Sequence, residues 1–328
     1  MTDTPTTHTS APNIDTVREL GQRISNWRRW GEHDQLGTLN HLRPEHRVAA
    51  SRLVASGEVI SLSLPLDSQG PQHRDSGRIN PVHLMTVTGR DFTSPGSADR
   101  DVQRRYLQNA DDMLFLPTQS GTQWDGLAHV FFEQQMYNGY SAAHVSSNGA
   151  RRNAITSAAD RMVARGVLLD LPAALGCDAL EPGHAITGAD LDRACSESGV
   201  EVGPGDVVLV RTGALARVRK RGQWADYAGG PAPGLGLDSV SWIAEHEIAA
   251  LATDTWDVEV RPAQTPDVAQ PVHILLIVMM GLWIGEMFDL EQLAETCARL
   301  GRYEFLFTAP PLVITGGIGS PINPLAVL

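Results

Sequence analysis

Cysteine is scarce in this sequence, with three residues among 328, and no two of them form a C-x-x-C pair. The absence of closely spaced pairs argues against a disulfide framework and against a cysteine-based zinc site. We therefore expect Cys177, Cys195 and Cys297 to act as small apolar side chains in a cytoplasmic protein.

Segments that would direct the chain to a membrane are also missing. The longest apolar run, residues 274–284, is shorter than the ~20 residues needed to span a bilayer. Residues 1–13 lack the apolar stretch of a secretory signal and are rich in Thr, Ser and Pro, so we expect a disordered tail there. No membrane partner is expected.

Positive charge is in short supply, and the formal net charge is -12. Such a surface repels phosphate backbones, so nucleic acid is not an expected partner. The glycine-rich motifs of nucleotide-binding folds and the G-x-S-x-G motif of serine hydrolases are absent. With 42% hydrophobic residues the chain has ample material for a core, and we expect a small molecule as its partner.

The hydrophobic pattern predicts a mixed α/β protein. Strands dominate early, and helices and strands alternate afterwards, which favours a mixed sheet in one domain. Helices are predicted at residues 14–26, 44–56, 187–198, 239–246, 272–280 and 290–300. Strands are predicted at residues 59–66, 82–87, 113–117, 166–171, 206–212, 248–253 and 304–309.

The densest polar cluster runs from Gln119 to His129. On an extended strand, odd positions share a face, so Gln119, Gln123 and Asp125 would point the same way. Gly121, which lies between the amides of Gln119 and Gln123, would leave a gap for an ion or a polar substrate. If the chain turns at Gly126, His129 folds back towards Asp125. On spacing alone, a polar loop in which Asp125 caps a turn is the favoured explanation.

This segment resembles the H-x-G-T-H-x-D-x-P-x-H signature of the cyclase family, which includes bacterial kynurenine formamidases, isatin hydrolases and trans-dienelactone hydrolases. The matching residues are Gly121, Thr122, Asp125 and His129. Gln119 and Gln123 stand where the family has His, and Leu127 stands where it has Pro. Residues 30–40, 137–139 and 205–213 are similar to further family segments, and His273 and Glu286 resemble its C-terminal metal-binding pair.

The resemblance implies the swivelling β/β/α fold, a mixed sheet flanked by helices, with residues 14–328 as a single cyclase-like hydrolase domain. It also implies metal-dependent hydrolysis of a cyclic amide, a lactone or a related acyl C–N or C–O bond. We expect the protein to form a homodimer or homotetramer.

Carried over by position, the resemblance implies His129 as the catalytic acid/base, with Asp125 as the securest metal ligand and a catalytic residue. The remaining metal-ligand candidates are Gln119, Gln123, His273 and Glu286. A glutamine can ligate only through its neutral amide oxygen, so two Gln in place of His shift preference from Zn²⁺ towards Mn²⁺, Mg²⁺ or Ca²⁺. We expect a divalent metal, Mn or Zn, with Mg or Ca as alternatives. Loss of the metal, with the pocket reused, remains open.

Four residues are candidates for substrate binding. Asp254 and Trp256 lie in a loop after an apolar strand, where α/β proteins place active-site loops, although an ordinary turn is the alternative. Trp124, Trp256 and Trp283 are candidates to line a pocket for an aromatic ring, and packing in the core is the equal alternative.

Two further functional classes remain open from the sequence. One is a metal-independent lyase, cyclase or dehydratase that transfers protons with His129 and Asp125. The other is a non-catalytic small-molecule binder on the same scaffold. Metal content separates the first class from a hydrolase, and ligand retention without turnover identifies the second.

Overall fold

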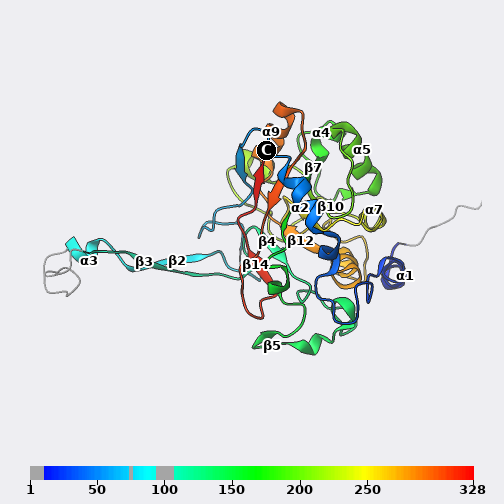
Figure 1. Cartoon of the computed structure of the whole chain (residues 1–328), viewed down its shortest axis with the longest axis horizontal. Helices are drawn as coiled ribbons and strands as arrows, with labels where there is room; N and C mark the ends of the chain where they lie inside the picture. Colours follow the sequence, from blue (N-terminus) through cyan, green and yellow to red (C-terminus); the bar gives the residue numbers. More distant parts are fainter. Residues whose placement is uncertain (1–10, 74–76, 94–106) are drawn as a thin grey trace, which may run out of the picture.

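The computed structural model describes residues 11–73, 77–93 and 107–328. Within these ranges, nine strands form one sheet at the centre of the molecule (Figure 1). In spatial order they are β1 (Val59–Ser61), β15 (Leu325–Val327), β13 (Glu304–Thr308), β7 (Val163–Asp170), β9 (Val207–Arg211), β11 (Ala250–Thr253), β12 (Trp283–Glu286), β4 (Gln123–Asp125) and β14 (Gly319–Pro321).

The sheet is mixed, with a parallel centre and antiparallel flanks. Strands β7, β9, β11 and β12 run parallel, whereas β13, β15 and β1 on one side and β4 and β14 on the other pair antiparallel. The central strands are continuous apolar runs and are buried, as parallel strands covered on both faces must be. The predicted fold, a mixed sheet flanked by helices, is confirmed.

Helices cover the sheet. They are α1 (Ile14–Ile24), α2 (Pro44–Ser51), α4 (Leu171–Leu175), α5 (Gly188–Ser198), α6 (Ala214–Arg221), α7 (Ser239–Glu245), α8 (Pro271–His273) and α9 (Glu291–Leu300), with the short α3 (Arg90–Thr93) away from the body. Their ends follow the capping rules: Thr187 and Asp190 form a capping box at the start of α5, and Gly199 ends it in the left-handed conformation. Helix α1 begins after Asn13, and the predicted tail lies mostly outside the described residues.

Shorter helical turns complete the layer. They are η1 (Gly37–His41), η5 (Tyr137–Gly139), η6 (Ala142–His144), η7 (Ile155–Ala158) and the π-helix η8 (Ile274–Met280). The predicted helix at 272–280 therefore exists as α8 followed by η8, and Gly281, with φ of 72°, ends it. The four-residue strand β12 that follows was not predicted.

Two predicted elements were too long. The helix predicted at 44–56 ends at Ser51, because the backbone N–H groups of Ser56 and Gly57 donate to the carbonyl oxygen of Leu328 instead of continuing the helix. The strand predicted at 59–66 ends at Ser61, and beyond it only Ser63 forms a bridge, to Phe288.

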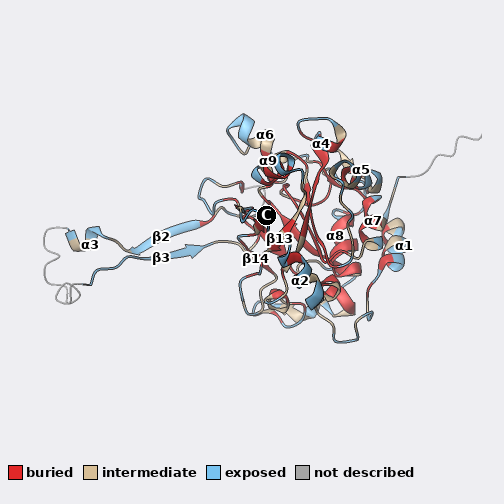
Figure 2. Ribbon diagram, turned by 45° about the horizontal axis from the view of Figure 1, so that its top comes forward, coloured by how far each residue is buried: buried red, intermediate tan, exposed pale blue. Residues whose placement is uncertain are grey.

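Three small two-stranded sheets accompany the main one. They are β2 (Val82–Val87) with β3 (Asp111–Phe115), β5 (Val145–Ser146) with β6 (Gly149–Ala150), and β8 (Ala185–Ile186) with β10 (Gly234–Leu235). Figure 2 shows that the buried residues gather in the body, whereas the β2–β3 ribbon stands out from it and is exposed. Over the described part of the chain, no helix is both long and apolar enough to cross a membrane.

Candidate active site

Strand β4 brings two predicted site residues to one face. Gln123 and Asp125 are two positions apart, so their side chains point the same way, and Glu286 of β12 lies directly opposite Gln123 in the antiparallel register. The Gln123 amide donates to Glu286 Oε2 at 2.9 Å and approaches Asp125 Oδ1 at 3.4 Å. All three side chains are buried. The parallel part of the sheet meets its antiparallel flank here.

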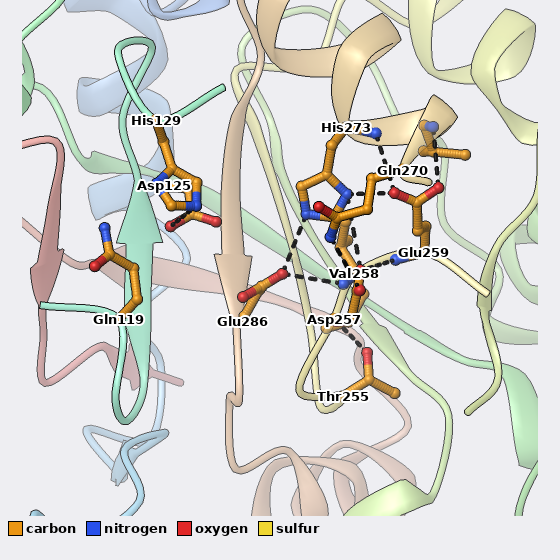
Figure 3. A network of polar contacts seen from close by, with 12 residues as sticks. Gln119, Asp125, His129, Thr255, Asp257, Val258, Glu259, Gln270, His273 and Glu286 are labelled. Atoms are coloured by element: carbon orange, nitrogen blue, oxygen red, sulfur yellow. Dashed lines mark hydrogen bonds and ion pairs between the residues drawn. The ribbon is translucent and has the colours of Figure 1, made fainter. Parts of the chain in front are cut away.

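His129 joins this face through a turn. Its backbone N–H donates to the carbonyl oxygen of Gly126 at 2.9 Å, and its Nε2 lies 3.8 Å from Asp125 Oδ1 (Figure 3). The expected fold-back at Gly126 is thus confirmed. The His129 side chain is 22% exposed, against 1% for Asp125, so it lies at the margin of the site where a small molecule has access. Its Nδ1 is buried without a hydrogen-bond partner among the described residues.

His273 enters from the other side, at the end of α8. Its Nε2 lies 3.4 Å from Glu286 Oε1, and its Nδ1 lies 2.6 Å from Glu259 Oε1. Glu259 also accepts from the backbone N–H groups of Val272 and His273, so one carboxylate caps the helix and orients the imidazole. Sequence reasoning missed Glu259.

Asp257 supports the same imidazole from the loop after β11. Its Oδ1 lies 3.7 Å from His273 Nδ1, and its Oδ2 accepts from Arg261 at 3.1 Å and from Gln270 at 3.1 Å. Asp257 lies in the loop that the sequence singled out, although Asp254 and Trp256 were the residues chosen from it. The available signal was the alternation Asp257-x-Glu259 directly after a buried strand, which places two carboxylates at one sheet edge.

Two overlapping groups of ligand atoms result. Asp125, His273 and Glu286 offer atoms within 4.8 Å of one another, as do Asp257, Glu259 and His273. Burial, followed by repulsion from Asp125, raises the pKa of Glu286 to about 7. Burial alone would lower the pKa of His273, but Asp257, Glu259 and Glu286 raise it well above its ordinary value. The cluster therefore holds excess negative charge that protons or a cation must balance.

Gln119 comes from a turn and not from the strand. Strand β4 begins at Gln123, so the prediction that residues from 119 onwards share one extended face was wrong. The Gln119 Oε1 accepts from Thr118 Oγ1 at 2.8 Å, and its Nε2 is buried without a partner among the described residues. The expected gap at Gly121 is also absent, because Leu66 Cδ2 would lie 3.1 Å from a Cβ placed there.

The structure does not bring Trp124 or Asp254 to the cluster. Trp124 lies between Gln123 and Asp125 and so faces the opposite side of β4, where it is 0% exposed and donates to the carbonyl oxygen of Ala309. Asp254 accepts from Thr212 N–H, Thr212 Oγ1 and Gly213 N–H, and thereby ties the end of β9 to that of β11. Trp124 therefore packs in the core, and Asp254 holds the local structure. The sequence had left both roles open as alternatives to substrate binding.

The other two candidate side chains, Trp256 and Trp283, differ in their surroundings. Trp283 is buried in the core and donates to the carbonyl oxygen of Leu36. Trp256 is half-buried; its ring is covered by the guanidinium groups of Arg78 and Arg261, at 5.3 and 5.7 Å from the ring centre. It lines a pocket together with Trp224 and Tyr227. A role in substrate binding stays a prediction for Trp256.

Comparisons with known proteins agree with this fold. The family model Cyclase, described as "Putative cyclase", matches residues 60–260. A solved structure described as a novel cyclase is 36% identical, with a TM-score of 0.84, and the match covers 94% of this chain and 99% of that one. Among curated proteins no sequence matches this chain.

More distant structures share the fold. Isatin hydrolase A from Labrenzia aggregata, bound to benzyl benzoate, is 21% identical with a TM-score of 0.58, over 84% of this chain and 94% of its own. A predicted metal-dependent hydrolase from Bacillus stearothermophilus is 16% identical with a TM-score of 0.52, over 83% and 98%.

Proposed function

This chain belongs to the Cyclase family, and from that premise we propose that it is an enzyme, a metal-dependent hydrolase of a cyclic amide, a lactone or a related acyl C–N or C–O bond. The names of the isatin hydrolase and of the metal-dependent hydrolase support the reaction class. The observation that carries the proposal is the convergence of Asp125, His273 and Glu286 from three separate elements at one buried point.

The donor set fits a divalent cation. Asp125 and Glu286 offer carboxylate oxygens, and His273 directs Nε2 towards Glu286, where a metal would lie, because Glu259 holds its Nδ1, as is usual for metal-bound imidazoles. Gln123 adds a buried amide oxygen that has no partner among the described residues. Three oxygens and one nitrogen favour Mn²⁺ over Zn²⁺, which prefers nitrogen and sulfur. When bound, such a cation polarises an acyl oxygen and lowers the pKa of a water molecule.

The protein's own groups would handle the proton and the orientation. His129 lies at the open margin, with Nε2 towards Asp125 and Nδ1 without a partner, so its imidazole would take a proton from the attacking water and return it to the leaving group. Glu259 would keep the His273 ring in one tautomer and orientation. The buried surroundings strengthen each of these interactions by excluding water.

Elemental analysis tests the proposal directly. Protein purified without chelator should contain a divalent metal and should hydrolyse members of a panel of cyclic amides and lactones, with activity lost on chelation and restored by Mn²⁺. Asp125→Asn should keep its circular dichroism and lose both metal and most activity. The matched control Asp178→Asn removes an exposed carboxylate from the loop after α4 and should change neither. Full metal and full activity in Asp125→Asn would overturn the assignment.

One observation favours a second candidate, a metal-independent lyase, cyclase or dehydratase. The Gln123 amide already bridges Glu286 Oε2 and approaches Asp125 Oδ1, the place where a cation would otherwise balance the two carboxylates. In that case His129 and Asp125 would transfer protons without a Lewis acid. Turnover that survives exhaustive chelation, in protein shown to be free of metal, would select this candidate over the hydrolase.

A further inference from the structure

A cavity of about 360 Å³ lies apart from the candidate active site. Its lining residues come from α1, η1, α7 and the end of η8, or from the chain directly after α1 and α7. None of Asp125, His273 and Glu286, the proposed metal ligands, is among them. The volume is in the range of small-molecule sites. The cavity therefore has room for a ligand of its own.

The charged side chains of the cavity leave one positive charge without a partner. Arg29 forms an ion pair with Glu247, and Glu247 Oε2 also lies 3.9 Å from His41 Nδ1. Burial lowers the pKa of His41 below its ordinary value, so this imidazole is neutral at pH 7. The Arg23 guanidinium, in the last turn of α1, forms no ion pair or hydrogen bond within the described part of the chain. The cavity thus carries an excess of one positive charge in a protein whose net charge is -12.

The rest of the lining combines apolar side chains with a strained backbone. Ile24, Ile243 and Ile248 line the same cavity as Arg23 and offer contact to an organic group. Glu247 has a φ of 50°, which is costly for a residue other than glycine. Residues in such conformations cluster at ligand clamps and active sites. Both features are typical of a binding site for a small organic molecule.

We propose that this cavity binds a small monocarboxylate, with the carboxylate on the Arg23 guanidinium and the organic group against Ile24, Ile243 and Ile248. The planar fork of a guanidinium matches the two oxygens of a carboxylate. A single excess positive charge is neutralised by a monocarboxylate, whereas a phosphate group carries about 1.5 to 2 negative charges at pH 7. The binding site does not depend on the reaction proposed for the candidate active site.

The cavity also contacts the turn that joins two of the proposed metal ligands. Met280 lines it and lies in the sequence between His273, at the start of η8, and Glu286 of β12. Asn26, another lining residue, donates through Nδ2 to the carbonyl oxygen of Met280 at 2.9 Å. Segments of π-helix such as η8 occur mostly at functional sites. A carboxylate bound here would stabilise this turn and, through it, the placement of His273 and Glu286.

Calorimetric titration of the full chain with sodium benzoate tests the site. Wild type should bind benzoate with a Kd of about 0.1–1 mM, as expected for a ligand of this size. Benzamide and inorganic phosphate should each bind at least about tenfold more weakly, because the first lacks the charge and the second carries too much. Arg23→Gln should weaken benzoate binding by about tenfold or more. The matched control Arg52→Gln removes an exposed arginine outside the cavity and should not change the Kd.

A second variant tests the cavity without changing its charge. Ala244 of α7 lines the cavity, so Ala244→Trp should fill it and abolish benzoate binding while the circular dichroism is kept. Hydrogen exchange tests the contact with η8. Benzoate at ten times its Kd should slow exchange of the amides in residues 274–282 by up to about tenfold in wild type. The same addition should not slow it in Arg23→Gln.

Four outcomes would overturn the proposal. The first is the absence of benzoate binding up to about 10 mM. The second is equal binding by wild type and Arg23→Gln, which would place benzoate elsewhere in the molecule. The third is tighter binding of benzamide or phosphate than of benzoate. The fourth, benzoate binding that leaves exchange in residues 274–282 unchanged, would refute the contact between the cavity and the turn that joins His273 to Glu286.

Discussion

The two halves of the candidate site differ in how completely their polar atoms are satisfied. In the half built by β12, α8 and the loop after β11, both nitrogens of His273 face carboxylates, and Glu259 also accepts two backbone N–H groups (Figure 3). In the half built by β4 and its flanking turns, Gln119 Nε2, Gln123 Oε1 and His129 Nδ1 are buried without hydrogen-bond partners in the described chain.

This difference separates a preformed support from a half that a ligand would complete. Buried polar atoms without partners cost about 1–3 kcal/mol each, so they persist where a bound group supplies the missing partner. The satisfied half keeps its geometry by itself, because backbone donors and paired charges fix the His273 ring. We infer that the substrate engages the half formed by Gln119, Gln123 and His129, and that the satisfied half supplies His273 and Glu286 to a cation shared with Asp125.

The largest expected effect comes from a substitution in the unsatisfied half. His129→Ala should lower turnover by roughly 10²–10⁴-fold, the usual contribution of a general acid/base, with metal content unchanged. His129→Gln should behave similarly, because the amide fills a similar volume and forms hydrogen bonds but neither gains nor loses a proton at neutral pH. Steady-state kinetics and elemental analysis of the same preparations check both parts. Metal and activity lost together would instead make His129 a metal ligand.

Breaking the satisfied half should have a smaller and different effect. Glu259→Gln keeps the side-chain volume but removes the carboxylate that orients His273, and loss of such an outer partner costs about 10–100-fold in metal affinity. Turnover at saturating metal should recover substantially, because Glu259 does not touch the reacting atoms. Metal titration followed by kinetics at saturation measures the two effects separately.

A matched control for Glu259→Gln is Glu197→Gln, which removes an exposed carboxylate from helix α5. The control should leave metal affinity unchanged. If saturating metal does not restore turnover in Glu259→Gln, then Glu259 acts on the reaction directly and the division of the site into a support and a reacting half is incorrect.

The sequence predicted the unsatisfied half better than the satisfied one. Asp125 and His129 are four residues apart, and a turn at Gly126 is enough to bring them together, so local pattern carried the information. The prediction wrongly placed Gln119 on an extended strand, because residues 118–122 form a turn. The Ser-Gly pair at 120–121 was the sequence signal against a strand there.

Two features of the site depend on tertiary structure. They are the contact of Glu259 with His273 and the pairing of Glu286 with Gln123. Strand β12 has only four residues and follows a helix that Gly281 ends, so neither its existence nor its register with β4 is encoded in a local period. Glu259 reaches His273 across 14 residues, through the return of the chain from the sheet edge to α8. The parallel strands β7, β9 and β11 were predicted well because they are buried on both faces and read as continuous apolar runs.

The comparison can be sharpened by restoring imidazoles in the unsatisfied half. Gln119→His with Gln123→His should raise Zn²⁺ affinity by about tenfold or more, because imidazole is the better zinc ligand. Of the two, Gln123→His should account for most of the change, since Gln123 lies among Asp125 and Glu286 whereas Gln119 has no hydrogen bond to the cluster. Zinc titration of the single and double variants decides this; equal or weaker binding in the double variant would place neither residue at the metal.

The mildest perturbation of the site is a change of pH, and its effect on metal affinity should come from the satisfied half alone. Burial and Asp125 raise the pKa of Glu286 to about 7, and neighbouring carboxylates raise the pKa of His273 well above its ordinary value. A raised pKa means that the proton is retained to higher pH, and a cation must displace it in order to bind. Affinity for Mn²⁺ should therefore rise with pH, by up to about tenfold per unit for each proton released.

Calorimetric titration between about pH 6 and pH 8, in buffers of different ionisation enthalpy, counts the released protons. Glu286→Gln removes one titrating group and should flatten the dependence, whereas His129→Ala should leave it unchanged. A metal affinity independent of pH would show that neither proton competes with the cation, and would contradict its placement at His273 and Glu286.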